Sequence, residues 1–223
     1  MWTSSVYRPV RVSRLLVTAL LTVAMLVPFG LGTPAEAATR SQVTEAQAKL
    51  KELGYPVGAV DGVDGPQTRR GLCAWRRLSG RTAHRNALTS SELKAIRGTT
   101  RLPNASSGRG VTVDKTCQAV YHREGGRWRK VLAASTGSGG LPRVGWYRVQ
   151  RKRPGWHTST RYPAPSPNMY NSVYFDGAIA LHGARQVPTY PASKGCVRLT
   201  VRGADYLYPR LRVGDPVRVI GRY

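Results

Sequence analysis

From residue 111 to the end, the apolar residues fall into short alternating runs, and this pattern most constrains the fold. Each run is long enough for one strand: residues 111–113, 119–122, 128–132, 173–181, 197–201 and 217–220. Glycine-rich turns separate several runs, and prolines at positions 154, 163, 165 and 167 exclude a continuous helix or central strand there. Residues 204–211 favour a short helix that Pro209 limits. This part of the chain is therefore predicted to be mainly β, with antiparallel strands.

Residues 43–97 follow the helical period instead. Apolar side chains recur at spacings of three and four residues up to Leu53, and Gly54 follows as a helix stop. Pro66 suits the first position of a second helix, and a Thr-x-x-Glu capping box beginning at Thr89 predicts a third. The run between the first two helices is rich in glycine and aspartate, which implies consecutive tight turns. We expect three helices around a turn-rich loop.

The N-terminus has the composition of a secretory signal peptide. Three arginines precede the apolar run Leu15–Val27, and Ala35-Glu36-Ala37 fits a cleavage site. The apolar run is short for a membrane span, so we expect no transmembrane span in the mature chain. The alternative is an uncleaved membrane anchor.

The formal net charge of +24 predicts anionic partners. Nucleic acid, acidic cell-wall polymers, anionic membranes and charged peptide stems would all be attracted by it. An exported protein does not meet genomic DNA, so export argues against a nucleic-acid partner and favours the cell-wall polymers.

The chemistry concentrates in Ser193–Leu199, whose sequence is Ser-Lys-Gly-Cys-Val-Arg-Leu. A cysteine that follows a glycine can sit on a tight turn, because Gly195 has no Cβ to block a substrate carbonyl. The backbone N–H groups of Lys194, Gly195 and Cys196 can converge there on a developing oxyanion. The segment therefore predicts a nucleophilic cysteine with its own oxyanion hole.

His182 and Gly183 close the apolar run that precedes this segment. A histidine at the end of a strand can take the thiol proton if the fold brings it within reach, and the Gly183 carbonyl can fix its tautomer. The alternative is a buried structural Cys196 beside a core histidine.

Together these residues resemble the active-site signature of YkuD-type L,D-transpeptidases, in which a strand ends in His-Gly and a loop leads to Ser-His-Gly-Cys, a hydrophobic residue, and Arg or Asn. The matching residues are His182, Gly183, Ser193, Gly195, Cys196, Val197 and Arg198. Lys194 replaces the family's usual histidine, and its charge can favour the Cys196 thiolate. The resemblance implies an antiparallel β-sandwich over residues 111–221.

In that resemblance Cys196 is the nucleophile, and His182 is the general acid/base oriented by Gly183. Substrate-binding residues would be Ser193, Arg198 and Tyr174, with Arg185 or Lys194 as further cations for stem carboxylates. Residues Trp156–Asn171 would form a lid with Tyr170 and Tyr174 as substrate walls; the alternative is an exposed loop with ordinary core tyrosines.

Three cysteines in an exported chain suggest one disulfide and one free thiol. With Cys196 as nucleophile, Cys73 and Cys117 are the expected pair. The alternative leaves Cys73 as a buried thiol on an apolar helix face.

The helical region resembles the three-helix peptidoglycan-binding domain. The matching residues are Leu53-Gly54-Tyr55, Gly58, Asp61-Gly62, Gly65 and Thr68. Trp75-Arg76 replaces the family's usual Phe-Gln, so we expect an altered glycan-contacting surface; a purely structural helical unit is the alternative. The predicted organisation is a signal peptide at 1–37, a peptidoglycan-binding domain at 40–97, a linker at 98–110 and an L,D-transpeptidase catalytic domain at 111–221.

The resemblance implies an exported, monomeric cysteine L,D-transpeptidase that forms 3→3 peptidoglycan cross-links from tetrapeptide stems through a Cys196 thioester. It also implies a cell-wall location, inactivation by carbapenems, and no cofactor or metal. An L,D-carboxypeptidase and a non-catalytic wall-binding protein are the alternatives. His84, His122 and His157 lack metal-ligand spacing, and we expect them to be surface or satisfied polar residues.

Overall fold

The computed structural model describes residue 1 and residues 38–223, so the predicted signal peptide lies outside the described residues. None of the helices within the described range is long and apolar enough to cross a membrane. Residues 38–223 belong to one compact unit.

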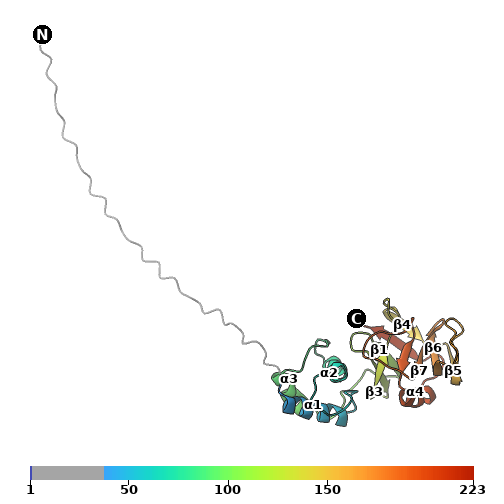
Figure 1. The fold of residues 1–223 in the computed structure, drawn as a ribbon, viewed down its shortest axis with the longest axis horizontal. Helices are drawn as coiled ribbons and strands as arrows, with labels where there is room; N and C mark the ends of the chain where they lie inside the picture. Colours follow the sequence, from blue (N-terminus) through green and yellow to red (C-terminus); the bar gives the residue numbers. More distant parts are fainter. Residues whose placement is uncertain (2–37) are drawn as a thin grey trace. The chain divides into compact units, whose positions relative to one another are not determined.

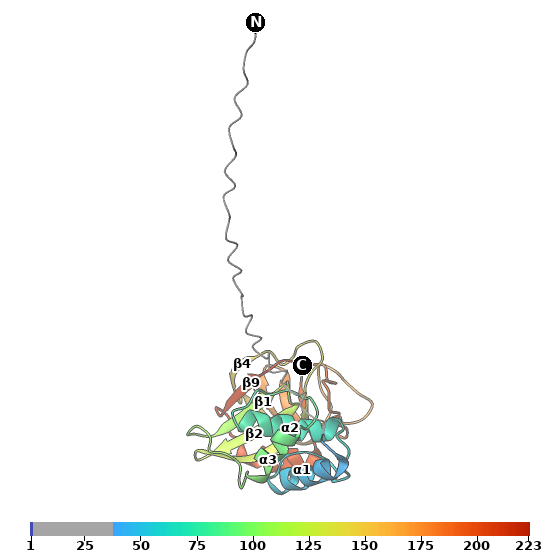
Figure 2. The same ribbon diagram turned by 90° about the vertical axis from the view of Figure 1, so that its left-hand side faces the viewer.

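The described chain begins with the three expected helices, α1 (Arg40–Glu52), α2 (Pro66–Leu78) and α3 (Ser90–Arg97). Thr39 and Thr89 cap α1 and α3 through reciprocal capping boxes, and Pro66 opens α2. Figure 2 shows the three helices grouped together.

The remainder is mainly β, as predicted. The strands are β1 (Gly110–Asp114), β2 (Ala119–Glu124), β3 (Arg127–Ser135), β4 (Gly145–Arg148), β5 (Arg151–His157), β6 (Met169–Asp176), β7 (Ile179–Gly183), β8 (Val197–Leu199) and β9 (Pro216–Ile220). Helix α4 (Val201–Leu207) lies against β7 (Figure 1), and the short 3₁₀ helix η1 (Tyr208–Arg210) follows α4 directly.

The predicted antiparallel sandwich is corrected in its detail. The strands form one curled sheet in the order β4-β9-β1-β2-β3-β8-β7-β6-β5, rather than two separate sheets. Two of its pairings, β1 with β9 and β7 with β8, are parallel. Parallel neighbours need a long connection, and residues 184–196 provide one between β7 and β8. Because the two strands run in the same direction, His182 lies beside Arg198, and the residues that precede β8 lie beside the start of β7.

Two apolar cores hold the fold together. One lies around the sheet and α4, where Phe175, Leu181, Val197 and Leu207 are buried. The other joins α1, α2 and α3 to β2 and β3; its members include Leu50, Leu72, Ile96, Cys117, Tyr121 and Val131. The helices and the sheet therefore share a continuous interior.

A disulfide crosses this second core. It joins Cys73 of α2 to Cys117, the pair expected from the sequence, with a Cα–Cα distance of 5.3 Å. The segment predicted as a linker also packs on the sheet, since Ala105 N–H donates to the Gly126 carbonyl at 2.9 Å. Both contacts tie the helical region to the β region.

Trp75 and Arg76 do not form a glycan-contacting surface. Both are fully buried, and Arg76 donates to the Glu92 carboxylate and to the carbonyls of residues 84, 86 and 87. The burial of Arg76 has a physical reason: the arginine stem fills the interior while its fork satisfies otherwise unpaired acceptors. The pair stabilises the helical region from within.

Candidate active site

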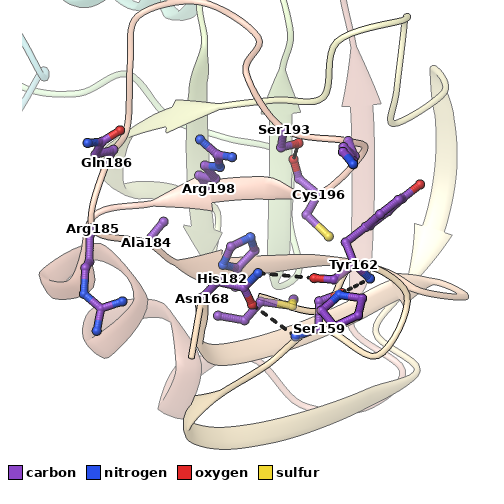
Figure 3. Close-up of a pocket in the computed structure, with 13 residues that line it drawn as sticks. Ser159, Tyr162, Asn168, His182, Ala184, Arg185, Gln186, Ser193, Cys196 and Arg198 are labelled. Carbon is purple, nitrogen blue, oxygen red and sulfur yellow. Dashed lines mark hydrogen bonds between the residues drawn. The ribbon is translucent and has the colours of Figure 1, made fainter. Parts of the chain in front are cut away.

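The parallel pairing of β7 and β8 brings the two motif segments together. Leu181 pairs with Val197 and His182 with Arg198, so Cys196 lies one residue before the paired region. Figure 3 shows the Cys196 sulfur and the His182 ring facing one cavity. That cavity has a volume of about 520 Å³, and both side chains line it.

His182 is held as a neutral base. Its side chain is almost fully buried, and its Nδ1 lies 2.9 Å from the Gly183 carbonyl oxygen. A carbonyl can only accept, so Nδ1 carries the proton and Nε2 keeps a free lone pair. Burial lowers the pKa of His182 to about 4; the Gly183 contact opposes this and Arg198 adds to it. The imidazole is therefore neutral at pH 7.

Cys196 is a free, partly buried thiol. Its Sγ donates to the Ala178 carbonyl at 3.7 Å. Burial raises the pKa of the Cys196 thiol, and the Ala180 backbone and Arg198 counteract part of that increase. A neutral thiol thus faces a neutral imidazole in the resting site, in contrast to a preformed thiolate–imidazolium pair.

The expectation that Lys194 favours the Cys196 thiolate does not hold. Lys194 Nζ lies over the Tyr162 ring, 4.8 Å from its centroid, and Arg198 is the cation that lowers the thiol pKa. Because the Lys194 side chain is exposed, water screens its charge.

The motif turn is braced from inside by Ser193. Its hydroxyl donates to the Cys196 carbonyl at 2.5 Å and accepts the Gly195 N–H at 3.1 Å. One sequence expectation changes as a result, since the Gly195 N–H is already bonded to Ser193; the Ser193 hydroxyl lines the cavity and keeps one acceptor lone pair. The N–H groups of Lys194 and Cys196 donate to no atom of residues 38–223. Gly195 has φ +144°, a conformation that disfavours a side chain.

The end of β3 supports the motif turn from behind, a contact that was not predicted from the sequence. Ser135 Oγ donates to the Tyr190 carbonyl at 2.7 Å, and the Thr136 carbonyl accepts from the N–H groups of residues 192 and 193. A Cβ on Gly137 would lie 2.6 Å from the Gly195 Cα. The Ser-Thr-Gly sequence that ends this strand was the available signal.

The two tyrosines proposed as substrate walls do not line the cavity. Tyr174 is buried with Met169 and Ala180 behind Cys196, while Tyr170 packs on Trp156 with ring centroids 5.1 Å apart. Both lie on β6, where Tyr174 belongs to the continuous buried run 172–175 and Tyr170 is half-buried.

His157 was predicted to be a surface or satisfied polar residue, and the structure shows a satisfied one that lies beneath the site. It is buried, its Nε2 lies 3.1 Å from Ser172 Oγ, and its charge would oppose protonation of His182. The signal for it is weak, because only the pairing of β5 with β6 brings it to this position.

Residues 158–168, between β5 and β6, form the facing wall of the cavity. Ser159, Tyr162 and Asn168 line it, as Figure 3 shows. Arg198 and Arg185 line the opposite side, and Arg185 donates to the Pro167 carbonyl at 2.8 Å. The cavity is therefore cationic and opens beside the thiol.

Metal ligands do not gather in the part of the chain that the structure describes. No three His, Cys, Asp or Glu side chains there lie close enough to hold a metal ion.

Comparison with protein families and solved structures identifies this arrangement. The model of the YkuD L,D-transpeptidase catalytic domain matches residues 108–219, and that of a peptidoglycan-binding domain matches residues 39–82. The chain belongs to the YkuD L,D-transpeptidase family and carries an N-terminal peptidoglycan-binding domain.

Two solved structures resemble the chain over most of its length. The L,D-transpeptidase from Xylanimonas cellulosilytica is 29% identical, with 84% of this chain and 97% of that chain covered and a TM-score of 0.58. An L,D-transpeptidase from Stackebrandtia nassauensis is 24% identical, with 85% and 95% covered and a TM-score of 0.51. A comparison with curated proteins finds no significant match.

Proposed function

We propose that this protein is a cysteine L,D-transpeptidase that forms 3→3 cross-links in peptidoglycan. The observation that carries the proposal is the neutral His182, whose Nδ1 is fixed by the Gly183 carbonyl while its ring faces the cavity of Cys196. A base in this state can accept a proton at Nε2 when a substrate carbonyl arrives. The catalytic domain at 111–221 and the binding domain at 40–97 act as one unit in this proposal.

The first half-reaction acylates the cysteine. Cys196 Sγ attacks the carbonyl of the third stem residue, a diamino acid, at its L-centre, and the thiol proton passes to His182 Nε2. The peptide C–N bond breaks, D-alanine leaves with that proton on its amine, and a thioester remains on Cys196. Because both groups start neutral, the proton transfer is coupled to the attack.

The oxyanion formed in this step would be stabilised by the N–H groups of Lys194 and Cys196. Neither N–H group donates a hydrogen bond to an atom of residues 38–223, whereas the Gly195 N–H donates to the Ser193 hydroxyl. Fixed backbone donors in a partly buried site need no reorganisation as the charge develops. Ser193 therefore stabilises the motif turn through its two hydrogen bonds, and Gly195 adopts the positive φ of that turn.

The second half-reaction transfers the acyl group to a neighbouring stem. The side-chain amine of that stem attacks the thioester, loses a proton to His182, and the C–S bond breaks to return the thiol proton to Cys196. Arg198 and Arg185 line the cavity and suit the carboxylates of the two stems. Water in place of the amine would make the enzyme a carboxypeptidase.

The partners and location follow from this function. The substrate is extracytoplasmic, so the proposal includes export by the N-terminal segment and action as a monomer at the cell wall. Carbapenems would acylate Cys196 in the same way as a stem peptide. The peptidoglycan-binding domain would raise the local concentration of glycan strands.

The direct test incubates residues 38–223 with disaccharide-tetrapeptide and reads products by mass spectrometry. Cross-linked dimers with released D-alanine, absent from Cys196→Ala, are the expected result. Tripeptide with D-alanine and no dimer would assign a carboxypeptidase instead. No product, with retained binding to cell-wall sacculi, would identify a wall-binding protein on an idle catalytic fold.

A further inference from the structure

One face of α2 contacts the catalytic domain at three successive points. Arg70, Cys73 and Arg77 share this face, since residues three, four and seven apart lie on one side of a helix. Cys73 is bonded to Cys117, and Arg77 donates to the fully buried Asp114 carboxylate at 2.8 Å. These two contacts fix α2 against the ends of β1 and β2.

The third contact reaches the connection that carries the catalytic motif. Arg70 Nη2 donates to the Pro188 carbonyl at 2.6 Å and lies 3.5 Å from that of Val187. Arg85, which follows α2, donates to the Thr189 carbonyl at 2.5 Å. Two arginines of the helical domain therefore hold three consecutive carbonyls between β7 and β8.

Arg70 is an unusual choice for this position. The side chain is almost fully buried, and no Asp or Glu carboxylate of residues 38–223 forms a salt bridge with it. Its Nε also has no hydrogen-bond partner in the described part of the chain. Burial and the nearby Arg85 lower the pKa of Arg70 to about 10. A buried cation without a counter-ion is unfavourable, so packing alone does not account for it.

The carbonyls that Arg70 and Arg85 hold lie between cavity-lining residues. Arg185 and Gln186 precede them and Ser193 follows them along the connection, and all three line the catalytic cavity. The end of β3 fixes residues 190–193 from the other side. A displacement of residues 187–189 would therefore move the motif turn relative to His182.

We infer that α2 of the peptidoglycan-binding domain is a positioning element of the active site, with Arg70 as its positioning residue. The inference rests on the proposed function and extends it. The domain both places the enzyme on its polymer and sets the geometry of Cys196 against His182. Removal of the Arg70 guanidinium would leave both reacting groups present but misaligned.

The test compares Arg70→Met, which removes the charge and donors, with Arg70→Lys, which keeps the charge and one donor group. Arg69→Met is the matched control, because Arg69 is the neighbouring residue on α2, is partly exposed and pairs with Asp64. Three readouts are taken on residues 38–223 with the disulfide intact. These are the thermal midpoint, kcat and KM for cross-linking, and the rate of Cys196 alkylation by iodoacetamide against pH.

A misplacement of about 1 Å costs on the order of 10²-fold in rate, so Arg70→Met is expected to lower kcat about 10- to 100-fold with KM nearly unchanged. Its alkylation profile should shift along the pH axis, because the surroundings of Cys196 change. Arg70→Lys should recover part of the rate, and Arg69→Met should stay within about twofold of wild type. A folded Arg70→Met with wild-type kcat and pH profile would overturn the inference.

If Arg70→Met does not fold, Arg85→Gln gives the same test through the neighbouring carbonyl. A lowered kcat with a retained thermal midpoint supports the inference, and an unchanged kcat overturns it. The alkylation readout separates this inference from the proposed function. A wild-type chain without cross-linking activity, whose Cys196 reactivity still depends on Arg70, would refute the transpeptidase and leave the positioning role intact.

Discussion

The two walls of the catalytic cavity are built differently. Residues 187–196, the motif wall, are anchored by β3, by the Ser193 brace and by two arginines from outside the sheet. Residues 158–168, the loop wall, bond mainly within themselves, as when Ser159 N–H donates to the Asn168 side chain at 3.1 Å. Their contacts across the cavity are made by Arg185 and by Lys194 over Tyr162. We infer that the motif wall carries the nucleophile and that the loop wall, together with Arg185 and Arg198, selects the substrate.

Removal of a reacting group should have the largest effect. Cys196→Ala and His182→Ala are each expected to lower cross-linking by at least about 10³-fold, because the covalent step loses its nucleophile or its base. Product dimers counted by mass spectrometry provide the measurement. Ser159→Ala on the loop wall is the control and should stay within about threefold. Near-normal turnover in either catalytic variant would refute the assignment of the site.

The next test adds a methyl group where the motif wall meets β3. In Gly137→Ala the new Cβ would lie 2.6 Å from Gly195 Cα and 2.7 Å from its nitrogen, and backbone atoms cannot yield as a flexible side chain would. We expect kcat to fall on the order of 10²-fold as the turn is displaced. Gly98→Ala controls for the added methyl group itself, since neither Gly98 nor Gly137 has a positive φ and a Cβ on Gly98 would meet no atom closer than 3.6 Å. Equal activity of the two variants would show that the motif wall is not fixed at this point.

Acid should destabilise the fold through His182, the buried base on β7 beside the motif wall. The pKa of His182 is about 4 in the folded chain and its ordinary value is 6.5, so the unfolded chain binds the extra proton first as pH falls. The contribution of His182 to the free energy of unfolding is therefore fully present above about pH 6.5 and is lost towards pH 4, a decrease of roughly 3 kcal/mol. Urea unfolding of wild type and His182→Gln between pH 4 and 7 measures the difference. If the free energy of unfolding changed equally with pH in wild type and His182→Gln, His182 would not be held neutral in the folded chain.

The sequence could predict those parts of the site that depend on neighbours in the chain. Helix caps at Thr39 and Thr89, the first turn at Pro66 and the Gly183 carbonyl beside His182 are local features. Alternation likewise predicted the mainly β class. A parallel β7–β8 pair, in contrast, depends on the path of a long connection, which has no local signal.

Burial of polar residues was the main source of error. Arg76 looks like a surface residue in the sequence, yet Glu92 satisfies it inside, and His157, expected to be a surface or satisfied polar residue, is buried against Ser172. Each partner lies at least 15 positions away in the chain. Arg70 belongs to the same group, because its acceptors are 117 and 118 residues distant. Hydrogen bonds of this range follow only from the assembled fold.

The smallest expected effect concerns the loop wall. Tyr162→Leu removes the contact of the ring with Lys194, whose Nζ lies 4.8 Å from the centroid, at a partly exposed position. Such contacts are worth about 0.5–1 kcal/mol, so KM for the tetrapeptide should rise roughly two- to fivefold while kcat is retained. Alkylation of Cys196 by iodoacetamide should not change, because a small reagent does not need the wall.

The control for that variant is Tyr190→Leu, an exposed tyrosine on the motif connection whose side chain does not line the catalytic cavity. It should leave KM unchanged. A fall in kcat of about 10²-fold in Tyr162→Leu would mean that the loop wall helps to align Cys196 with His182. The chemistry would then depend on both walls, and the Lys194–Tyr162 contact would join the mechanism in place of substrate selection.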